Sequence, residues 1–299
     1  MLNAVGPSEC SRTEFTVVQW KYFTELAGDS LATNYLNHYN NLNRYAALMG
    51  LGGDYFGADG KYTRLVERTI RDLERFFDMP GEVKVHGQHN ETLNDREMLV
   101  ELLKLLIMDW EDTEYLYQLA DEYIERNQSS PVLPESPFFS ADGFSTVNGL
   151  IVLGDGLVQM FIETGVDPEV VWTGILSHEW VHQIQIKNFS KWYPAGSFET
   201  IAESTRHIEL EADFISGYYM THKRGATYNW KRVEQFHHLF FQAGDCAFDL
   251  DFHHGTPEQR MAATRAGYEL AASMKKQGYI MTPQDLHDYF MDVVIPGII

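Results

Sequence analysis

The sequence predicts an α+β fold that is predominantly helical. Apolar residues recur at helical spacing along most of the 299 positions. One short apolar run, residues 148–153, is closed by a Gly-Asp-Gly turn and is typical of a strand. A long helix that begins at Pro168 contains a His-Glu-x-x-His motif, which makes it the most informative segment of the chain.

The remaining helices can be placed by apolar spacing and by helix-stop signals. We expect them over residues 13–50, 62–78, 94–126, 199–222, 228–241 and 257–276. Residues 127–137 contain three prolines and three serines, which is the composition of a linker. We therefore expect a boundary between a helical N-terminal region, residues 1–130, and a second domain, residues 131–299. The tyrosine-rich helices of the first region suggest a cap or accessory surface.

The bulk composition is that of an ordinary soluble globular protein, with 44% hydrophobic and 22% charged residues. The net charge of −20 argues against nucleic acid or an anionic membrane surface as a partner. No apolar run approaches the roughly 18 residues of a membrane span, and the first residues lack the features of a signal peptide. The expected location is cytoplasmic if the chain is full length, and exported if a signal or anchor has been removed.

Several cysteines and histidines have plain interpretations. Cys10 and Cys246 are too few for a disulfide scaffold, so we expect free thiols, with one bridge as the alternative in an exported protein. His86 and His89 lie in a polar segment without further ligands nearby, so we expect a solvated turn rather than a metal site. Three others are expected to have packing or surface roles: His237, His238 and His253.

The motif helix places two histidines one helical turn apart. His178 and His182, at positions i and i+4, share a face and can offer two imidazole nitrogens to one metal ion. Glu179 lies roughly 100° further round the helix, where it can reach a water at the metal without being a ligand. Neutral imidazole suits zinc, which lowers the pKa of such a water to about 7, so that a neighbouring carboxylate can take its proton.

The residues before the motif have the features of a helix start. Asp167 can cap the helix, Pro168 occupies its first position, and Glu169 places an acid in the first turn. No further proline follows until Pro194. We expect the strand at 148–153 to run beside this helix, as the strand with which a zinc protease holds an extended peptide.

A catalytic zinc site needs a third protein ligand. A metzincin would have glycine where this chain has Gln185 and a third histidine where it has Asn188, so that pattern fails. The remaining common solution is a glutamate on a second helix, and Glu209 is the candidate. Asp213, four residues later on the same face, is expected to accept the free N–H of a ligand histidine.

The helix of Glu209 also carries small residues that would let another helix approach closely: Ala212, Ser216 and Gly217. Glu203 and Glu211 are alternative ligands, although Glu211 points away from the face of Glu209. All of these acids can alternatively belong to a solvated helix face. The apolar neighbours of Glu209 and Asp213 argue against that alternative, because unpaired charges are costly among apolar side chains.

Three sequence blocks together resemble the bacterial neutral zinc metallopeptidase family, a gluzincin-like group. They are His-Glu-x-x-His-Gln-Ile-Gln from position 178, Glu-Leu-Glu-Ala-Asp-x-x-x-Gly from position 209, and His-Gly-Thr-Pro-Glu-Gln-Arg from position 254 with a later Gly-Tyr pair. The resemblance covers roughly residues 148–268. It implies a zincin fold, with His178, His182 and Glu209 as zinc ligands and Glu179 as the general base. Two features depart from the family, which usually has glycine in place of Val181 and commonly has an N-terminal membrane anchor.

The third block allows two interpretations. His254 or Arg260 can face the metal cleft and stabilise the oxyanion that forms when a carbonyl is attacked. Alternatively the block is structural, because Thr256 opens a capping box and Arg260 pairs with one of the many acids. Two tyrosines are weaker candidates for the oxyanion role: Tyr218 and Tyr219.

The sequence therefore predicts a zinc-dependent peptidase with one zinc ion per chain and a peptide or protein as its substrate. Glu179 would take the proton of the attacking water and deliver it to the leaving amine. The alternative is a zinc-stabilised binding or scaffold module that keeps these residues without turnover. A purely structural site has no need of a general base, which favours the enzyme.

Overall fold

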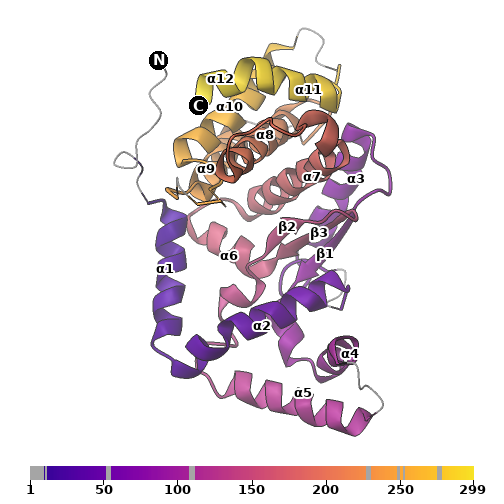
Figure 1. Ribbon diagram of the computed structural model, residues 1–299, viewed down its shortest axis with the longest axis vertical. Helices are drawn as coiled ribbons and strands as arrows, with labels where there is room; N and C mark the ends of the chain where they lie inside the picture. Colours follow the sequence, from indigo (N-terminus) through magenta and orange to yellow (C-terminus); the bar gives the residue numbers. More distant parts are fainter. Residues whose placement is uncertain are drawn as a thin grey trace.

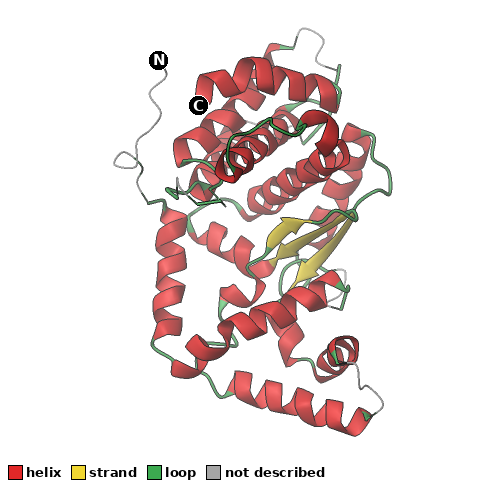
Figure 2. Cartoon of the chain, viewed as in Figure 1, coloured by secondary structure: helices red, strands yellow, loops and turns green. Residues whose placement is uncertain are grey.

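The computed structural model describes residues 10, 12–51, 55–107, 112–226, 230–247, 250–251, 253–274 and 278–299. Its helices are α1 (Glu14–Ala27), α2 (Ser30–Leu48), α3 (Thr63–Phe77), α4 (Arg96–Leu106), α5 (Thr113–Gln128), α6 (Asp155–Glu163), α7 (Pro168–Trp192), α8 (Ile201–Thr221), α9 (Trp230–Ala243), α10 (Pro257–Ser273), α11 (Pro283–Tyr289) and α12 (Ile295–Ile298). The strands are β1 (Lys84–Gln88), β2 (Gly143–Ser145) and β3 (Leu150–Gly154). The fold is predominantly helical around one small sheet, as predicted (Figure 1, Figure 2).

The predicted helices correspond to observed ones, with several differences. The predicted helix 94–126 is two helices, because the backbone is extended at Ile107 after α4 and the side chain of Asp112 caps α5. Helix α6 was not predicted. The predicted helix 13–50 is two helices, because α1 ends at Gly28 and Asp29 caps the start of α2 with its side chain. Parts of three predicted helices lie outside the described residues: 108–111, 228–229 and 275–276. Within the part of the chain that is described, no helix has both the length and the apolar character needed to cross a bilayer.

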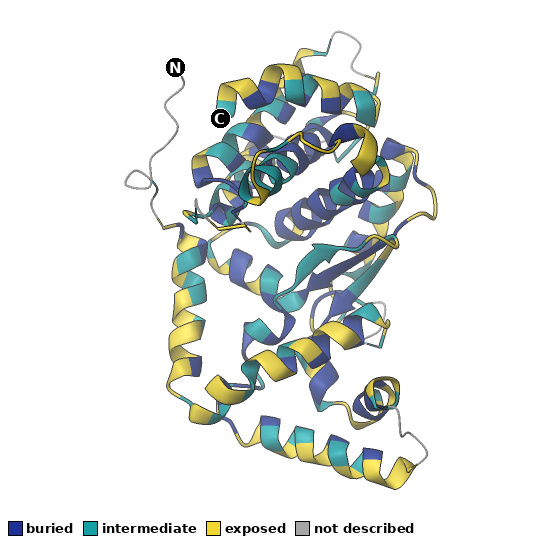
Figure 3. Cartoon of the chain, viewed as in Figure 1, coloured by how far each residue is buried: buried dark blue, intermediate teal, exposed yellow. Residues whose placement is uncertain are grey.

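The motif helix α7 lies inside the larger core. Asp167 caps it by accepting a hydrogen bond from the backbone N–H of Glu169, and Pro168 occupies the first position, as predicted. Side chains around most of its circumference are buried, Trp172 and Trp180 among them (Figure 3). A helix that is buried nearly all round is an interior helix, so α7 is a fixed platform for the histidines.

Helices α8 and α10 pack with their backbones almost in contact. A Cβ atom on Gly267 would lie 2.1 Å from the carbonyl oxygen of Phe214, and one on Gly217 would lie 2.5 Å from that of Thr264. Glycine is therefore required at both positions, because any Cβ would overlap the facing backbone. The expected close approach to the small residues of α8 is confirmed, and the approaching helix is α10.

The sheet has the strand order β1-β3-β2, with β1 parallel and β2 antiparallel to β3. Strand β3 is the predicted strand at 148–153, and it is buried along its whole length. It is hydrogen-bonded on both sides, so it has no edge on which an extended peptide could pair, and the prediction that it holds substrate is wrong. The strand with an unpaired edge near α7 is β2.

The sheet joins segments from both sides of the linker-like residues 127–137. Strand β1 precedes them and β3 follows them, with Lys84 opposite Leu150 in the register. The larger core likewise combines Phe15 of α1 and Val66 of α3 with α7. A second, smaller core lies among α2, α4 and α5. Residues before the predicted boundary therefore take part in the core that surrounds the motif helix.

Cys10 and Cys246 form a disulfide, with 5.8 Å between their Cα atoms, so the prediction of two free thiols is wrong. The bond links the segment before α1 to the loop after α9 (Figure 1). Its partners are separated by 236 positions. No local pattern could have paired them, because only the folding of α1 against α9 brings them together.

The solvated turn predicted for His86 and His89 is also wrong. His86 lies in strand β1, and His89 is completely buried. The Nδ1 atom of His89 lies 2.6 Å from Oδ2 of Asp155, and the ring of Tyr55 stacks on its imidazole with 3.8 Å between the centroids. The polar residues of this segment are therefore paired inside the protein rather than exposed to water.

Candidate metal centre

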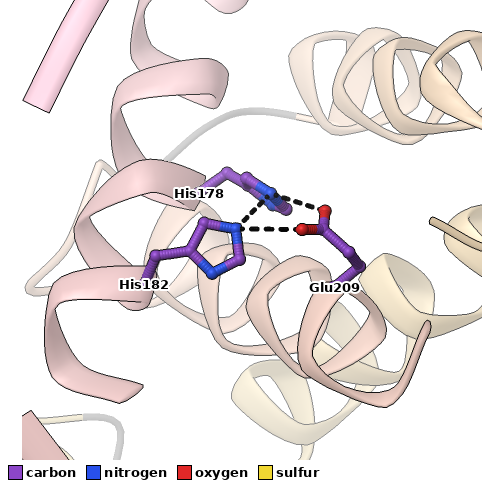
Figure 4. A group of neighbouring side chains, drawn as sticks. All are labelled: His178, His182 and Glu209. Atoms are coloured by element: carbon purple, nitrogen blue, oxygen red, sulfur yellow. Dashed lines mark hydrogen bonds and ion pairs between the residues drawn. The ribbon is translucent and has the colours of Figure 1, made fainter. Parts of the chain in front are cut away.

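Helices α7 and α8 bring the three predicted ligands together (Figure 4). Nε2 of His178 lies 3.1 Å from Nε2 of His182 and 3.2 Å from Oε2 of Glu209. Nε2 of His182 lies 3.3 Å from Oε1 of the same carboxylate. In the part of the chain that is described, no other group of three or more histidines, cysteines and acids has ligand atoms so close together.

The spacing of these atoms would allow both imidazoles and the carboxylate to contact one metal ion. With metal–ligand bonds of about 2.0–2.1 Å, neighbouring ligand atoms of a tetrahedron lie about 3.3 Å apart. The two Nε2 atoms are 3.1 Å apart, which is close to that value, and each lies 3.2 or 3.3 Å from a different oxygen of the Glu209 carboxylate. Two imidazoles and one carboxylate are also the type of ligand set that zinc has at catalytic centres, where a fourth position remains for water or substrate.

Gln185 determines which nitrogen of His182 carries the proton. Its Oε1 lies 2.7 Å from Nδ1 of His182, and its amide nitrogen donates to the backbone carbonyl of Ile208 at 2.8 Å. That carbonyl can only accept, so the amide nitrogen must face it and the amide oxygen must face His182. The proton of neutral His182 therefore lies on Nδ1, and the lone pair of Nε2 points at the ligand cluster.

Asp213 lies beside Nδ1 of His178, as Gln185 lies beside Nδ1 of His182. Its Oδ1 lies 3.0 Å from Nδ1 of His178, which is the distance of a hydrogen bond but without the angle of one. Arg260 holds the same carboxylate, since its Nε and Nη2 donate to the two oxygens at 2.7 and 2.8 Å. Nη2 of Arg260 also lies 3.6 Å from Oε2 of Glu209, so one guanidinium balances a buried and a partly buried acid.

The converging ligand atoms require a positive charge between them. Two imidazole lone pairs and a carboxylate at these separations repel one another unless a cation is present. Burial alone would lower the pKa of His178, but Asp213 and Glu209 raise it to about 9. Burial would raise the pKa of Glu209, but His182 and His178 hold it well below its usual range. Protons can therefore supply the charge, and a metal ion that binds at neutral pH displaces one.

Glu179 lines the same cavity without belonging to the ligand cluster. Oγ of Ser145, from strand β2, lies 3.0 Å from its carboxylate Oε2 and 2.7 Å from its backbone carbonyl oxygen. The side chain is only 6% exposed. The single hydroxyl proton of Ser145 is thus shared between the backbone carbonyl and the carboxylate of Glu179, which lies in the wall of the cavity.

The cavity at the metal centre has a volume of about 670 Å³, a size typical of ligand sites. It follows α7 from Ile175 to Phe189, and its other walls come from α1, β2, α6, α8 and α9. His254 and Arg260 both line it. The His254 side chain is 43% exposed, and its backbone N–H donates to Asp245 at 2.9 Å, whereas Arg260 is buried.

The alternative candidates have other partners. Glu203 accepts a hydrogen bond from the backbone N–H of Glu199, in the exposed first turn of α8. Glu211 is fully buried on the far face, as expected, where Tyr193 and Gln185 donate to it. The remaining candidates have core, packing or surface positions, with His238 exposed, and they do not line the cavity: Tyr218, Tyr219, His237, His238 and His253.

Three contributions to the site were not predicted. Ser145 lies in a three-residue strand that has no clear sequence signal. Gln185 did have a signal, because it lies three positions after His182 and residues at that spacing meet on a helix. Phe15, Thr16 and Gln19 of α1 also line the cavity, although they lie more than 150 positions before the motif.

Comparisons with protein-family models, curated proteins and solved structures found no significant match to this chain. The resemblance to the neutral zinc metallopeptidase family, and with it the zincin fold, therefore stays a prediction from the motif blocks.

Proposed function

We propose that the protein is a zinc-dependent peptidase that binds one zinc ion per chain through His178, His182 and Glu209. The observation that carries the proposal is the convergence of two imidazole nitrogens and a carboxylate, 3.1–3.3 Å apart, at the wall of a cavity. Glu179 in the same cavity adds the base that hydrolysis by an activated water requires. A zincin-like domain is the architecture that this helix pair favours.

A bound zinc ion would supply Lewis-acid chemistry, polarising a scissile carbonyl and making a water more acidic. Glu179 accepts the proton of the attacking water on its carboxylate and then donates it to the leaving amine. Ser145 keeps that carboxylate oriented through Oε2. His254, at the cavity rim, is the side chain that we assign to the developing oxyanion.

We do not assign Arg260 to the oxyanion of the substrate. Its Nε and Nη2 are engaged with Asp213, and its Nη1 donates to the backbone carbonyl of Ala243 at 3.3 Å. We therefore assign Arg260 to holding Asp213, and Asp213 to orienting His178. Arg260 is a positioning residue in this proposal.

The substrate that this arrangement favours is a peptide or a protein. Strand β2 has one edge paired with β3, and all three of its residues line the cavity. An extended peptide could add to the other edge, which would lay its backbone past the metal centre. The disulfide between Cys10 and Cys246 favours an oxidising compartment, and hence the exported alternative for localisation.

The competing function is a zinc-stabilised scaffold without turnover, and Glu179→Gln distinguishes the two. The change keeps the size of the side chain and removes its basic carboxylate. We expect the variant to bind zinc stoichiometrically and to lose about 10²–10⁴-fold in peptide cleavage, the usual contribution of a positioned general base. Zinc content is measured by mass spectrometry and cleavage with a broad peptide library.

Glu203→Gln is the matched control, because it makes the same change on α8 outside the cavity. It should leave both zinc binding and cleavage unchanged. Equal cleavage by wild type and Glu179→Gln would remove the base from the mechanism. Absence of cleavage by zinc-loaded wild type across the library would favour the scaffold.

A further inference from the structure

The part of the metal cavity beside Ile175 is enclosed by apolar side chains from four helices: Phe15 of α1, Leu157 and Phe161 of α6, Ile175 of α7, and Leu239 of α9. We call these five residues the apolar recess. Ile175 lies three positions before His178, so the recess and the metal centre are neighbours on one face of α7. The cavity continues past His182 to Phe189, which leaves the metal centre between its two ends.

Several members of the recess lie next to one another along the wall, and Leu239 lies beside Gly174, the residue before Ile175. The rings of Phe15 and Phe161 stack with 3.9 Å between their centroids. Leu157 lies four positions before Phe161 on α6, and both Leu157 and Ile175 lie against Gly143 of β2. Gly143 has no side chain, and a Cβ there would lie 2.6 Å from Leu157. The recess therefore packs directly against β2 at Gly143, where Leu157 occupies the space that a side chain would need.

Phe15 is fixed in this wall by contacts that reach across the chain. Its backbone N–H donates to Oε1 of Gln242 at 2.9 Å, and the hydroxyl of Thr13 donates to the backbone carbonyl of Gln242 at 3.0 Å. The disulfide between Cys10 and Cys246 ties the same segment to the loop after α9. A side chain from the N-terminal region thus has a defined position in the cavity of the motif helix.

Resting on the proposed peptidase function, we propose that the apolar recess selects substrates with a bulky apolar side chain next to the scissile bond, with Phe15 as a specificity-determining residue. An apolar lining favours apolar side chains such as leucine, isoleucine, methionine and phenylalanine. A charged side chain in the recess would lose its hydration without gaining a partner among these five residues. An alanine would leave apolar wall uncovered and gain less from burial.

The test uses the zinc-loaded full chain and a set of peptides that differ at one position, which is leucine, phenylalanine, alanine, lysine or aspartate. Because one methylene in an apolar pocket changes kcat/KM by about 10–200-fold, wild type should prefer leucine or phenylalanine over alanine by at least about 10-fold. Phe15→Trp reduces the recess. It should lower kcat/KM for the large apolar peptides selectively and leave the alanine peptide nearly unchanged.

Phe23→Trp is the matched control, since Phe23 lies on the same helix but is 52% exposed and does not line the cavity. It should leave the peptide preference unchanged. Leu157→Phe provides a second way to reduce the recess from α6 and keeps the test decisive if Phe15→Trp does not fold. Thermal unfolding of each variant separates a change of preference from a loss of structure.

Peptide binding to the zinc-loaded Glu179→Gln chain, measured by fluorescence anisotropy, gives a readout that does not depend on turnover. Cleavage by wild type without any preference among the peptides would overturn the recess and leave the peptidase function intact. Selective binding of apolar peptides without cleavage would overturn the peptidase function and retain the recess as a binding site. Neither cleavage nor selective binding would overturn both.

Discussion

At the scale of single residues, the proposed zinc site should depend on the groups that contact His178 and His182 from behind. Gln185 is 2% exposed and has two functions, since its oxygen faces His182 while its nitrogen donates to Ile208 and Glu211. Asp213, which Arg260 holds, lies 3.0 Å from Nδ1 of His178, and we propose the analogous role for it there. Residues in this position orient a ligand and fix its tautomer, so their removal weakens metal binding even though they never touch the metal.

Gln185→Leu tests this at the level of metal affinity. Loss of the amide oxygen leaves Nδ1 of His182 without an acceptor, so zinc affinity should fall by about 10–100-fold. The measurement is competition against a chromophoric chelator at fixed pH. Gln183→Leu is the matched control, because Gln183 is also buried on α7 but donates to the backbone carbonyls of Thr146 and Leu150. Equal affinities for the two variants would contradict the role of Gln185.

At the scale of elements, α1 is the helix whose attachment matters most to the cavity. Much of its outer surface is exposed, including Val17, Trp20 and Phe23 (Figure 3). Its inner side stacks Phe15 on Phe161, and its start is held by Gln242 and by the disulfide. A helix that packs through only a narrow apolar face has low local stability unless other bonds hold its end in place. The disulfide supplies that tie.

Cys10→Ser should therefore loosen α1 before it affects α7. We expect a loss of about 2–4 kcal/mol in the free energy of unfolding, the usual contribution of a disulfide that closes a long loop. Denaturant titration measures this loss. Chymotrypsin should also cut the variant faster after Trp20 or Phe23, while zinc binding is retained. A variant with unchanged stability and unchanged proteolysis would show that α1 is held by its other contacts alone. Reduction of the wild-type chain should reproduce the variant.

At the scale of the whole molecule, the core around the motif helix is made by both halves of the chain. Strand β1 pairs with β3 across the linker-like segment 127–137. Phe76 and Phe77 of α3 contact Tyr219 of α8, the helix of Glu209. The two helices that carry the candidate ligands, α7 and α8, are thus packed against residues that lie far before them in the sequence.

A chain of residues 131–299 alone should not form the native metal centre. It would lack strand β1, which pairs in parallel with β3, and the aromatic side chains of α3, which contact α8. Apolar surface of β3 and of α8 would therefore be exposed to water. We expect a loss of cooperative thermal unfolding by circular dichroism and a loss of stoichiometric zinc binding. A cooperative, zinc-binding fragment would show instead that residues 1–130 are an accessory region.

The sequence by itself determined the features that depend on helical period and on capping chemistry. The i,i+4 spacing of His178 and His182, the cap at Asp167, and the shared face of Glu209 and Asp213 all follow from 3.6 residues per turn. These features are local, so the residues that encode them are neighbours in the chain. Because the metzincin pattern is absent after His182, the third ligand was expected on a second helix.

Only the tertiary structure decided which distant segments meet. It paired Cys10 with Cys246, buried His89 against Asp155, and made β2 rather than β3 the edge beside the metal centre. Strand order and disulfide pairing depend on contacts between residues far apart in the chain, and periodicity in one segment carries no information about them. For the same reason, the sequence could not predict that residues of α1 line the cavity beside the candidate ligands.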